Sequence, residues 1–313
     1  MRSVYLRLSV TDACDLRCAY CRPVGTARRA GPRLDATQQL ALVERLNDVV
    51  AVEKVRITGG EPTLLPTLPD LVRDLRALLP RATLGLTTNG QRLTGLAAPL
   101  RQAGLDVINV SLDACHGPTL AHLTGGGKLD AVERGLEASR AAGFHKIKLN
   151  TVLLRRGNGH LLEGMVALAL RHHCEPRFIE LMPLGPGAAI YEREHLPADE
   201  ALAKLRQRME LVEDLGQQGA ARRYRLRDEH GREVVVGLIS PVSHPFCSGC
   251  HRLRLDSSGL LHGCLRQPDG VDLRGPLLQG DRRELTRRIH AALDSKHAPG
   301  QGWPRRSMAA IGG

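Results

Sequence analysis

Apolar and polar residues alternate in six short segments between Tyr5 and Met182, and helical stretches separate these segments. The period of two predicts β-strands at residues 5–10, 54–58, 83–87, 107–112, 146–152 and 177–181. Helical periodicity predicts helices at residues 37–50, 68–79, 93–103, 130–142 and 161–172, with Gly104 and Gly143 ending two of them. Six strand–helix units predict an α/β fold with a parallel sheet, either open or curled into an incomplete barrel.

The predicted strands are apolar on one face and polar on the other. Arg7, Arg56 and Lys148 each stand between apolar neighbours. Because the helices must cover the apolar face, the polar face is expected to point into a lumen. Cations buried in a lumen are costly unless an anion meets them, so we expect an anionic ligand there.

Three loops that follow the predicted strands carry candidate site residues. Gly59-Gly60-Glu61-Pro62 follows the second strand, residues 88–90 follow the third, and Asp113 ends the fourth. In α/β folds the carboxyl ends of the strands form the functional site. The two glycines before Glu61 allow the backbone to approach a ligand closely, although a simple tight turn would also account for them.

The pattern changes after Met182. Residues 184–187 indicate a boundary, residues 197–209 predict a helix, and residues 222–227 with 233–237 predict a hairpin. A second hairpin is expected to turn at residues 257–259. We therefore predict a first domain at residues 1–183 and an appended region at residues 184–313.

Six of the eight cysteines form two triplets, Cys14, Cys18 and Cys21 near the start and Cys247, Cys250 and Cys264 in the appended region. A structural zinc ion takes four protein ligands, whereas a [4Fe–4S] cluster held by three cysteines leaves one iron open to a small molecule. For the second triplet, a zinc site completed by His244, His251 or His262 remains an alternative. The isolated Cys115 and Cys174 are given no role.

Arg252 and Arg254 follow the second triplet at a spacing of two, so on a strand both face the same way. Arginines beside a metal site suit bidentate binding of phosphate or carboxylate. A solvated edge strand would account for them equally well.

The composition favours anionic partners, since 44 lysines and arginines against 33 aspartates and glutamates make the net charge +11 among 313 residues. Aromatic residues make up 3%, too few for a stacking platform, so a phosphorylated small molecule fits the charge as well as nucleic acid. The longest apolar stretch falls far short of the roughly 20 residues of a membrane helix. No apolar signal-peptide core opens the chain, and we expect a cytoplasmic protein.

The CxxxCxxC motif with Tyr20 before its last cysteine, the GGEP sequence and the polar-faced strands together resemble the radical S-adenosylmethionine enzymes. The resemblance implies an incomplete (β/α)6 barrel whose first triplet holds a [4Fe–4S] cluster that cleaves S-adenosylmethionine to a 5′-deoxyadenosyl radical. It also implies that Glu61 engages the methionyl amino group. The positions that match the cofactor-binding residues of these enzymes are Arg56, Gly60, Glu61, Thr88, Ser111, Asn150 and Met182.

The second triplet, the RxR sequence beside it and the terminal Gly-Gly are similar to the GTP 3′,8-cyclase family of molybdenum cofactor biosynthesis. This resemblance implies a second [4Fe–4S] cluster that binds the guanine of GTP, and conversion of GTP to 3′,8-cyclo-7,8-dihydro-GTP. The positions that match its substrate contacts are Arg7, Lys148, Arg177, Arg252, Arg254, Gly312 and Gly313. The chain departs from the family at His251, where asparagine or threonine is usual, and in the short segment at residues 22–29.

The same family implies an electron donor, a homodimer and a hand-off of the product to cyclic pyranopterin monophosphate synthase, with neither nucleic acid nor membrane as a partner. Two other hypotheses remain at this point. One is a radical S-adenosylmethionine peptide maturase with an auxiliary cluster. The other is a zinc-stabilised nucleic-acid-binding protein.

Overall fold

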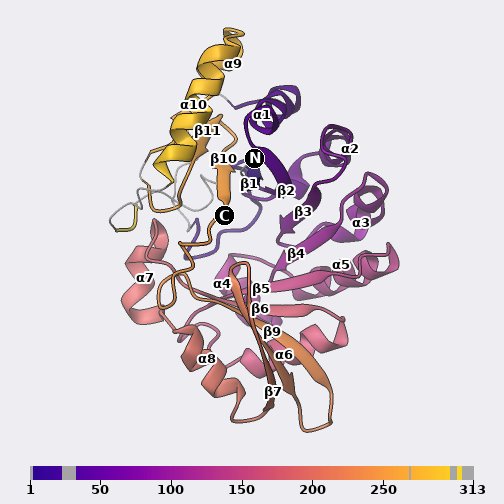
Figure 1. Ribbon diagram of the computed structural model, residues 1–313. Helices are drawn as coiled ribbons and strands as arrows, with labels where there is room; N and C mark the ends of the chain where they lie inside the picture. Colours follow the sequence, from indigo (N-terminus) through magenta and orange to yellow (C-terminus); the bar gives the residue numbers. More distant parts are fainter. Residues whose placement is uncertain (1–2, 23–32, 268, 297–301, 305–313) are drawn as a thin grey trace.

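The computed structural model describes residues 3–22, 33–267, 269–296 and 302–304 (Figure 1). One sheet runs through them, with the strand order β12-β11-β10-β1-β2-β3-β4-β5-β6-β9-β8-β7. Its centre is the succession β1 to β6, in which each strand pairs with the next in parallel. These are β1 (Ser3–Ser9), β2 (Ala51–Thr58), β3 (Thr83–Thr88), β4 (Val107–Ser111), β5 (Ile147–Leu153) and β6 (Glu175–Glu180).

The connecting helices cover the outer face of these strands, and Figure 1 shows α1, α2, α3 and α5 side by side along it. They are α1 (Ala36–Val49), α2 (Leu68–Leu78), α3 (Leu93–Gln102), α5 (Leu129–Ala141) and α6 (Leu162–Arg171). The apolar positions of the strands, such as Leu6, Ile57 and Leu86, are fully buried against them. The six predicted strand–helix units and the incomplete (β/α)6 barrel are therefore confirmed.

The appended region extends the sheet at both of its edges. β9 (Glu233–Ile239) pairs in parallel with β6 and continues into β8 (Ala221–Arg227) and β7 (Glu210–Gln218). β10 (Arg252–Leu255) pairs in parallel with β1 and leads to β11 (Leu260–His262) and β12 (Val271–Asp272). Both predicted hairpins are present, and the appended strands flank the barrel strands on either side.

Several elements were not predicted. α4 (Gly117–Thr124), α7 (Pro186–Glu194), α9 (Arg274–Leu278), α10 (Arg282–Ser295) and β7 have no counterpart in the sequence-based expectations. The Gly-Pro sequence interpreted as a boundary begins α7, because proline at the first helical position needs no hydrogen-bonded N–H. The helix expected at residues 197–209 is shorter, since α8 (Ala198–Leu205) ends in a turn before β7.

The predicted ends of two helices are confirmed by backbone geometry. Gly104 and Gly143 follow α3 and α5 with φ values of 99° and 86°, which glycine adopts without steric cost. None of the helices in the described ranges is long and apolar enough to cross a membrane.

Candidate active site

A cavity of about 1300 Å³ occupies the polar side of the barrel. Its walls carry every predicted site residue that the structure describes, whereas Gly312 and Gly313 lie outside the described residues. The lining includes both cysteine triplets, the predicted cofactor residues Arg56, Gly60, Glu61, Thr88, Ser111, Asn150 and Met182, and the predicted substrate residues Arg7, Lys148, Arg177, Arg252 and Arg254. The fold thus brings residues of the two sequence halves to one cavity.

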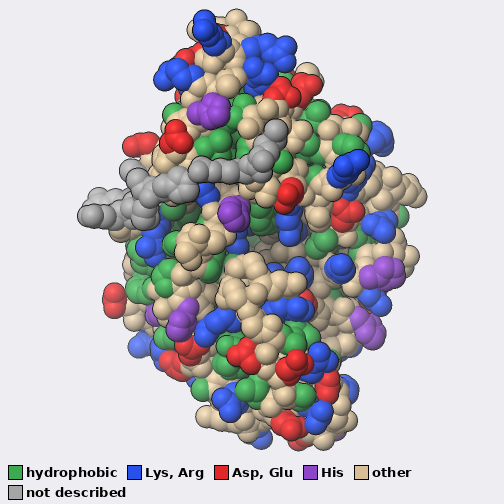
Figure 2. Space-filling view, viewed as in Figure 1, with side chains coloured by type: hydrophobic (Ala, Val, Ile, Leu, Met, Phe, Trp, Pro, Cys, Tyr) green, Lys and Arg blue, Asp and Glu red, His purple; other side chains and the backbone are tan. Residues whose placement is uncertain are grey.

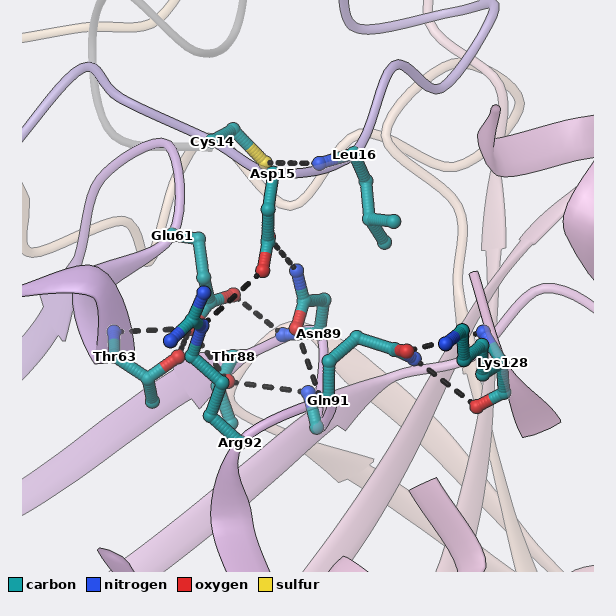
Figure 3. Close-up of polar contacts among 11 residues, drawn as sticks. Cys14, Asp15, Leu16, Glu61, Thr63, Thr88, Asn89, Gln91, Arg92 and Lys128 are labelled. Atoms are coloured by element: carbon teal, nitrogen blue, oxygen red, sulfur yellow. Dashed lines mark hydrogen bonds and ion pairs between the residues drawn. The ribbon is translucent and has the colours of Figure 1, made fainter. Parts of the chain in front are cut away.

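The loop of the first triplet is fastened to the neighbouring strand ends (Figure 3). Cys14 Sγ accepts a hydrogen bond from the Leu16 N–H at 3.4 Å, and Asp15 accepts one from Asn89 Nδ2 at 2.7 Å. Arg92 forms an ion pair with the same aspartate at 3.4 Å. These bonds hold the cysteine loop over the carboxyl end of β3.

Glu61 is buried at the end of β2, with its carboxylate facing β3 (Figure 3). Its Oε1 accepts hydrogen bonds from the N–H and the hydroxyl of Thr63 and from the Thr88 hydroxyl, while its Oε2 accepts one from the Asn89 N–H. Burial raises the pKa of Glu61, and these four hydrogen bonds counteract that rise. Of these four donors, the Asn89 N–H alone donates to Oε2. This oxygen therefore keeps a lone pair that can accept a hydrogen bond from a cationic group of a ligand.

The glycines before Glu61 allow a close approach of the backbone within the chain itself. A Cβ atom on Gly60 would lie 2.2 Å from the Ala13 carbonyl oxygen, and one on Gly59 would lie 2.4 Å from that of Thr11. The N–H groups of Gly60 and Glu61 donate to the same two carbonyls at 2.7 Å. The close approach is therefore to the cysteine loop of this chain, which positions Glu61 beside the first triplet.

Tyr20, inside the first triplet, anchors that loop to the barrel. Its hydroxyl donates to Asp113 Oδ2 at 2.6 Å, and Asp113 Oδ1 accepts from the Val152 N–H at 2.9 Å. Burial raises the pKa of Asp113 to about 6, against the effect of these hydrogen bonds. The surroundings of the first triplet are thus acidic as well as buried.

The cavity wall formed by β10, β1 and β2 is strongly basic. Register places Arg7 between Arg254 and Arg56 on adjacent strands. Arg56 is 2% exposed and donates to Tyr5 Oη, the Leu86 carbonyl and Asn109 Oδ1 at 3.0 to 3.1 Å. The chain's own acceptors therefore bind this guanidinium, although the sequence suggested that an external anion would be needed. A Cβ atom on Gly85 would lie 2.6 Å from Arg56 Cζ, so this glycine makes room for the arginine.

The other lumen cations lie close together in buried surroundings. Burial lowers the pKa of Arg7 to about 10, and burial together with the charge of Arg177 lowers that of Lys148 to about 8. Burial also lowers the pKa of Arg254 well below its ordinary value. Burial and neighbouring positive charges thus disfavour the charged forms of these groups, and a bound anion would favour them.

The second triplet lies in a basic environment. Lys296, which follows α10, places Nζ 3.6 Å from Cys250 Sγ and donates to the Arg252 carbonyl at 2.6 Å. Burial acts to raise the pKa of Cys250, but the hydrogen bond from the Arg252 N–H and the charges of Lys296 and Arg252 outweigh it and lower this pKa. Arg252 Cζ also lies 5.0 Å from the centre of the Phe246 ring.

The zinc alternative finds no support in the described residues. His244 pairs with Asp199 at 2.6 Å, and His262 is buried beside Asp256. Across the parts of the chain that the structure describes, no three His, Cys, Asp or Glu side chains converge on one metal ion. Two triplets of this kind suit [4Fe–4S] clusters, in which three thiolates bind three different irons and need not meet at one point.

The site also suits S-adenosylmethionine. Asn150 Oδ1 is buried on the cavity wall and, within the described ranges, has no hydrogen-bond partner. An orphaned acceptor in a polar cavity is costly unless a ligand satisfies it. Together with the free lone pair of Glu61, it offers two acceptors for the amino or hydroxyl groups of a cofactor.

Sequence reasoning missed several residues of this cavity, among them Tyr5, Lys54, Glu175 and Arg223. Tyr5 and Lys54 stand two positions before Arg7 and Arg56 and pair with each other across β1 and β2. Continuing the alternation backward along both strands would have found them. Arg223 and Lys296 had no such signal, because only the tertiary fold brings Arg223 to the cavity and Lys296 to Cys250.

The comparisons with known proteins agree with this geometry. The radical SAM superfamily model matches residues 8–169, and the Molybdenum Cofactor Synthesis C model matches residues 174–301. A GTP 3′,8-cyclase of Pelotomaculum thermopropionicum is 37% identical over 319 residues, covering 99% of this chain and 97% of the relative. The chain belongs to the GTP 3′,8-cyclase family. A second member, from Klebsiella pneumoniae, is 36% identical over 303 residues, covering 93% of this chain and 89% of the relative.

Family membership confirms the prediction of a radical S-adenosylmethionine enzyme with iron–sulfur clusters. Solved structures confirm the fold. Streptococcus suis SuiB bound to S-adenosylmethionine superimposes with a TM-score of 0.61 at 15% identity, over 85% of this chain and 61% of that chain. The native anSMEcpe structure with AdoMet and the Cp18Cys peptide gives a TM-score of 0.52 at 18% identity, over 66% of this chain and 59% of that chain.

Proposed function

We propose that this protein converts GTP to 3′,8-cyclo-7,8-dihydro-GTP, the first step of molybdenum cofactor biosynthesis, with S-adenosylmethionine and two [4Fe–4S] clusters as cofactors. The observation that carries the proposal is the shared cavity of about 1300 Å³, lined by both cysteine triplets and by the basic residues around them. The relatives named GTP 3′,8-cyclase support the choice of substrate and reaction.

The first end of the cavity serves the cofactor. Cys14, Cys18 and Cys21 would hold one cluster, and Glu61 would accept a hydrogen bond from the methionyl amino group through its free Oε2 lone pair. A reduced [4Fe–4S] cluster with bound S-adenosylmethionine supplies hydrogen-abstraction chemistry by one-electron transfer. Asn150 would accept a hydrogen bond from the bound cofactor.

The second end of the cavity serves the substrate. Cys247, Cys250 and Cys264 would hold the other cluster, which would supply a binding position for the guanine. Arg7, Lys148, Arg177, Arg252 and Arg254 would bind the triphosphate, because all five cationic side chains line the same cavity and guanidinium and ammonium groups bind phosphate by charge-assisted hydrogen bonds.

Positioning is the main contribution of the protein to this reaction. Cyclisation needs the ribose C3′ beside the hydrogen-abstracting group and the base C8 beside C3′. Holding reacting atoms in such a geometry contributes roughly 7–11 kcal/mol, and triphosphate binding can supply the energy that it needs.

The test is an isotope-transfer assay. Protein reconstituted without oxygen is given reductant, S-adenosylmethionine and GTP deuterated at C3′, and deuterium should appear in the 5′-deoxyadenosine that forms. GTP deuterated at C2′ is the matched control and should leave the 5′-deoxyadenosine unlabelled. Unlabelled 5′-deoxyadenosine from the C3′ substrate would refute the proposed reaction.

The remaining functional expectations belong to the same proposal. The protein would act in the cytoplasm as a homodimer, receive electrons from a separate donor and pass its product to cyclic pyranopterin monophosphate synthase. On the face shown in Figure 2, Lys and Arg side chains are mixed with Asp and Glu side chains. Such mixing suits a soluble biosynthetic enzyme better than a nucleic-acid-binding surface.

A further inference from the structure

A carboxylate lies among basic residues on the wall of the cavity. Glu175 Oε1 accepts a hydrogen bond from Arg177 Nε at 2.7 Å, and Glu175 Oε2 lies 3.5 Å from an Nη atom of Arg223. All three side chains line the cavity, with exposed fractions of 20% for Glu175, 14% for Arg177 and 24% for Arg223. Lys148 is the register partner of Glu175 on β5, so one carboxylate faces three cations.

The two arginines come from different parts of the chain and flank one glycine. Gly237 of β9 is the register partner of Arg177 on β6 and of Arg223 on β8. A Cβ atom on Gly237 would lie 3.1 Å from Arg177 Cγ, so the absence of a side chain leaves room for the arginine stem. The barrel and the appended hairpin thus contribute one guanidinium each to the same spot.

Arg223 is less well paired than Arg177. Its contact with Glu175 is long at 3.5 Å, and its Nε is buried with no partner in the described residues. A buried guanidinium N–H that finds no acceptor is costly, and a ligand oxygen would satisfy it. Phosphate groups match the planar donor pattern of arginine as carboxylates do, and they carry more charge.

We propose that Arg223 is a further phosphate-binding residue of this enzyme, and that Glu175 holds Arg177 and Arg223 in place until a phosphate group of the nucleotide replaces its carboxylate. The inference rests on the proposed function for the identity of the nucleotide. It adds two residues to that function. Arg223 comes from the appended hairpin, and Glu175 competes with the substrate for the same hydrogen-bond donors.

Equilibrium binding tests the inference without turnover. GTP and inorganic tripolyphosphate are titrated calorimetrically into the reconstituted protein and into the variants Arg223→Gln and Glu175→Gln. We expect Arg223→Gln to bind both ligands about tenfold more weakly, since a charge-assisted bond to phosphate is lost. We expect Glu175→Gln to bind both about threefold more tightly, since it removes a competing charge while keeping the size of the side chain.

Arg225→Gln is the matched control. Arg225 lies two residues further along β8, pairs with Glu213 and Glu233, and is not part of the cavity wall. Its variant should bind both ligands within about twofold of the unmodified protein. Arg223→Lys keeps the charge without the planar donors and should fall between Arg223→Gln and the unmodified protein, which keeps the test informative if the glutamine variant folds poorly.

Two outcomes would overturn the inference: unchanged binding of both ligands by Arg223→Gln and Arg223→Lys, or weaker binding by Glu175→Gln. Failure of the proposed function would look different. The unmodified protein would then bind GTP no better than ATP, while tripolyphosphate binding would still respond to the Arg223 and Glu175 variants.

Discussion

The two cysteine triplets have the same number of thiols but opposite surroundings. Burial raises the pKa of Cys14 to about 11 and that of Cys18 well above its ordinary value, and nearby Glu61 and Asp113 add to these rises. Beside Cys250, in contrast, Lys296 and Arg252 lower the thiol pKa. A cluster with acidic neighbours is harder to reduce than one with basic neighbours, because reduction adds negative charge.

This difference matches the two roles that we propose. Acidic surroundings at the first triplet would favour a low reduction potential, as donation of an electron to S-adenosylmethionine would require. The second cluster holds a polyanionic nucleotide, which a basic environment favours. Under the proposed function, the chain would separate an electron-donating end from a substrate-holding end by the charges that it places around equal sets of thiols.

The largest expected effect comes from removing one cysteine from each triplet. Cys18→Ala and Cys250→Ala should each abolish cyclisation and lower the iron content from about eight to about four atoms per chain. Only Cys18→Ala should lose S-adenosylmethionine binding, and only Cys250→Ala should lose the preference for GTP over ATP. Iron analysis measures the iron content, and calorimetric titration measures the binding of the ligands. If the two variants lost the same ligand, the proposed difference between the triplets would be wrong.

Cys115→Ala is the control for these two variants. Cys115 lies outside the cavity wall, where its sulfur contacts the Leu161 carbonyl at 3.9 Å. Its variant should keep the full iron content and bind both ligands normally.

Glu61→Gln sharpens the comparison at the acidic end. The neutral amide removes the negative charge that faces the cofactor and puts an N–H₂ group among four hydrogen-bond donors. S-adenosylmethionine should bind at least tenfold more weakly, and the free energy of unfolding should fall by about 1–3 kcal/mol. Calorimetric titration and denaturant unfolding measure these changes.

Thr63→Val separates the two effects of Glu61→Gln. It deletes one hydrogen bond to the carboxylate and leaves the charge in place. We expect a loss of stability of about 1 kcal/mol with nearly normal cofactor affinity. If Thr63→Val weakened the binding of S-adenosylmethionine as much as Glu61→Gln does, the Glu61 carboxylate would not be the group that binds the cofactor.

Lys296→Met tests the basic end. Removing a positive charge beside Cys250 should lower the reduction potential of the second cluster on the order of 50–100 mV and leave that of the first cluster unchanged. Redox titration followed by electron paramagnetic resonance resolves the two clusters. Equal shifts in both potentials, or none in the second, would contradict the proposed separation of charge.

Lys148 provides the smallest effect, a dependence of GTP binding on pH. Its pKa in the free protein is lowered to about 8, so the cationic form that binds phosphate is present below that pH and is lost above it. Between pH 7 and pH 8.5, GTP affinity should fall about fourfold, in proportion to the protonated fraction. Lys148→Arg should remove most of this fall.

Tyr5 titrates in the same range and needs its own control. Burial acts to raise its pKa, but the charges of Arg56 and Arg7 and the hydrogen bond from Arg56 lower it to about 7. Its ionisation as the pH rises would also weaken anion binding. Tyr5→Phe should therefore flatten the profile of GTP affinity at the lower end of this pH range. If neither Tyr5→Phe nor Lys148→Arg changed the profile, Tyr5 and Lys148 would be excluded as its cause.

The local sequence determined the six strand–helix units, the two cysteine triplets and the basic face of the strands, because each depends on short-range patterns. Alternation in the strands of Arg7, Arg56 and Lys148 specifies which side chains share a face. The CxxxCxxC spacing specifies three thiols on one loop, and the glycines before Glu61 specify a close backbone approach. The sequence did not show that this approach is to the cysteine loop, since that loop lies more than 40 residues away along the chain.

Only the tertiary structure decided what the appended region contributes. Pairing of β10 with β1 places Arg254 beside Arg7, and pairing of β9 with β6 places Arg223 beside Arg177. Lys296 reaches Cys250 from the end of a helix that no sequence pattern had indicated. These contacts join residues far apart in the chain, and their partners are set by sheet register and helix packing, which depend on the whole fold.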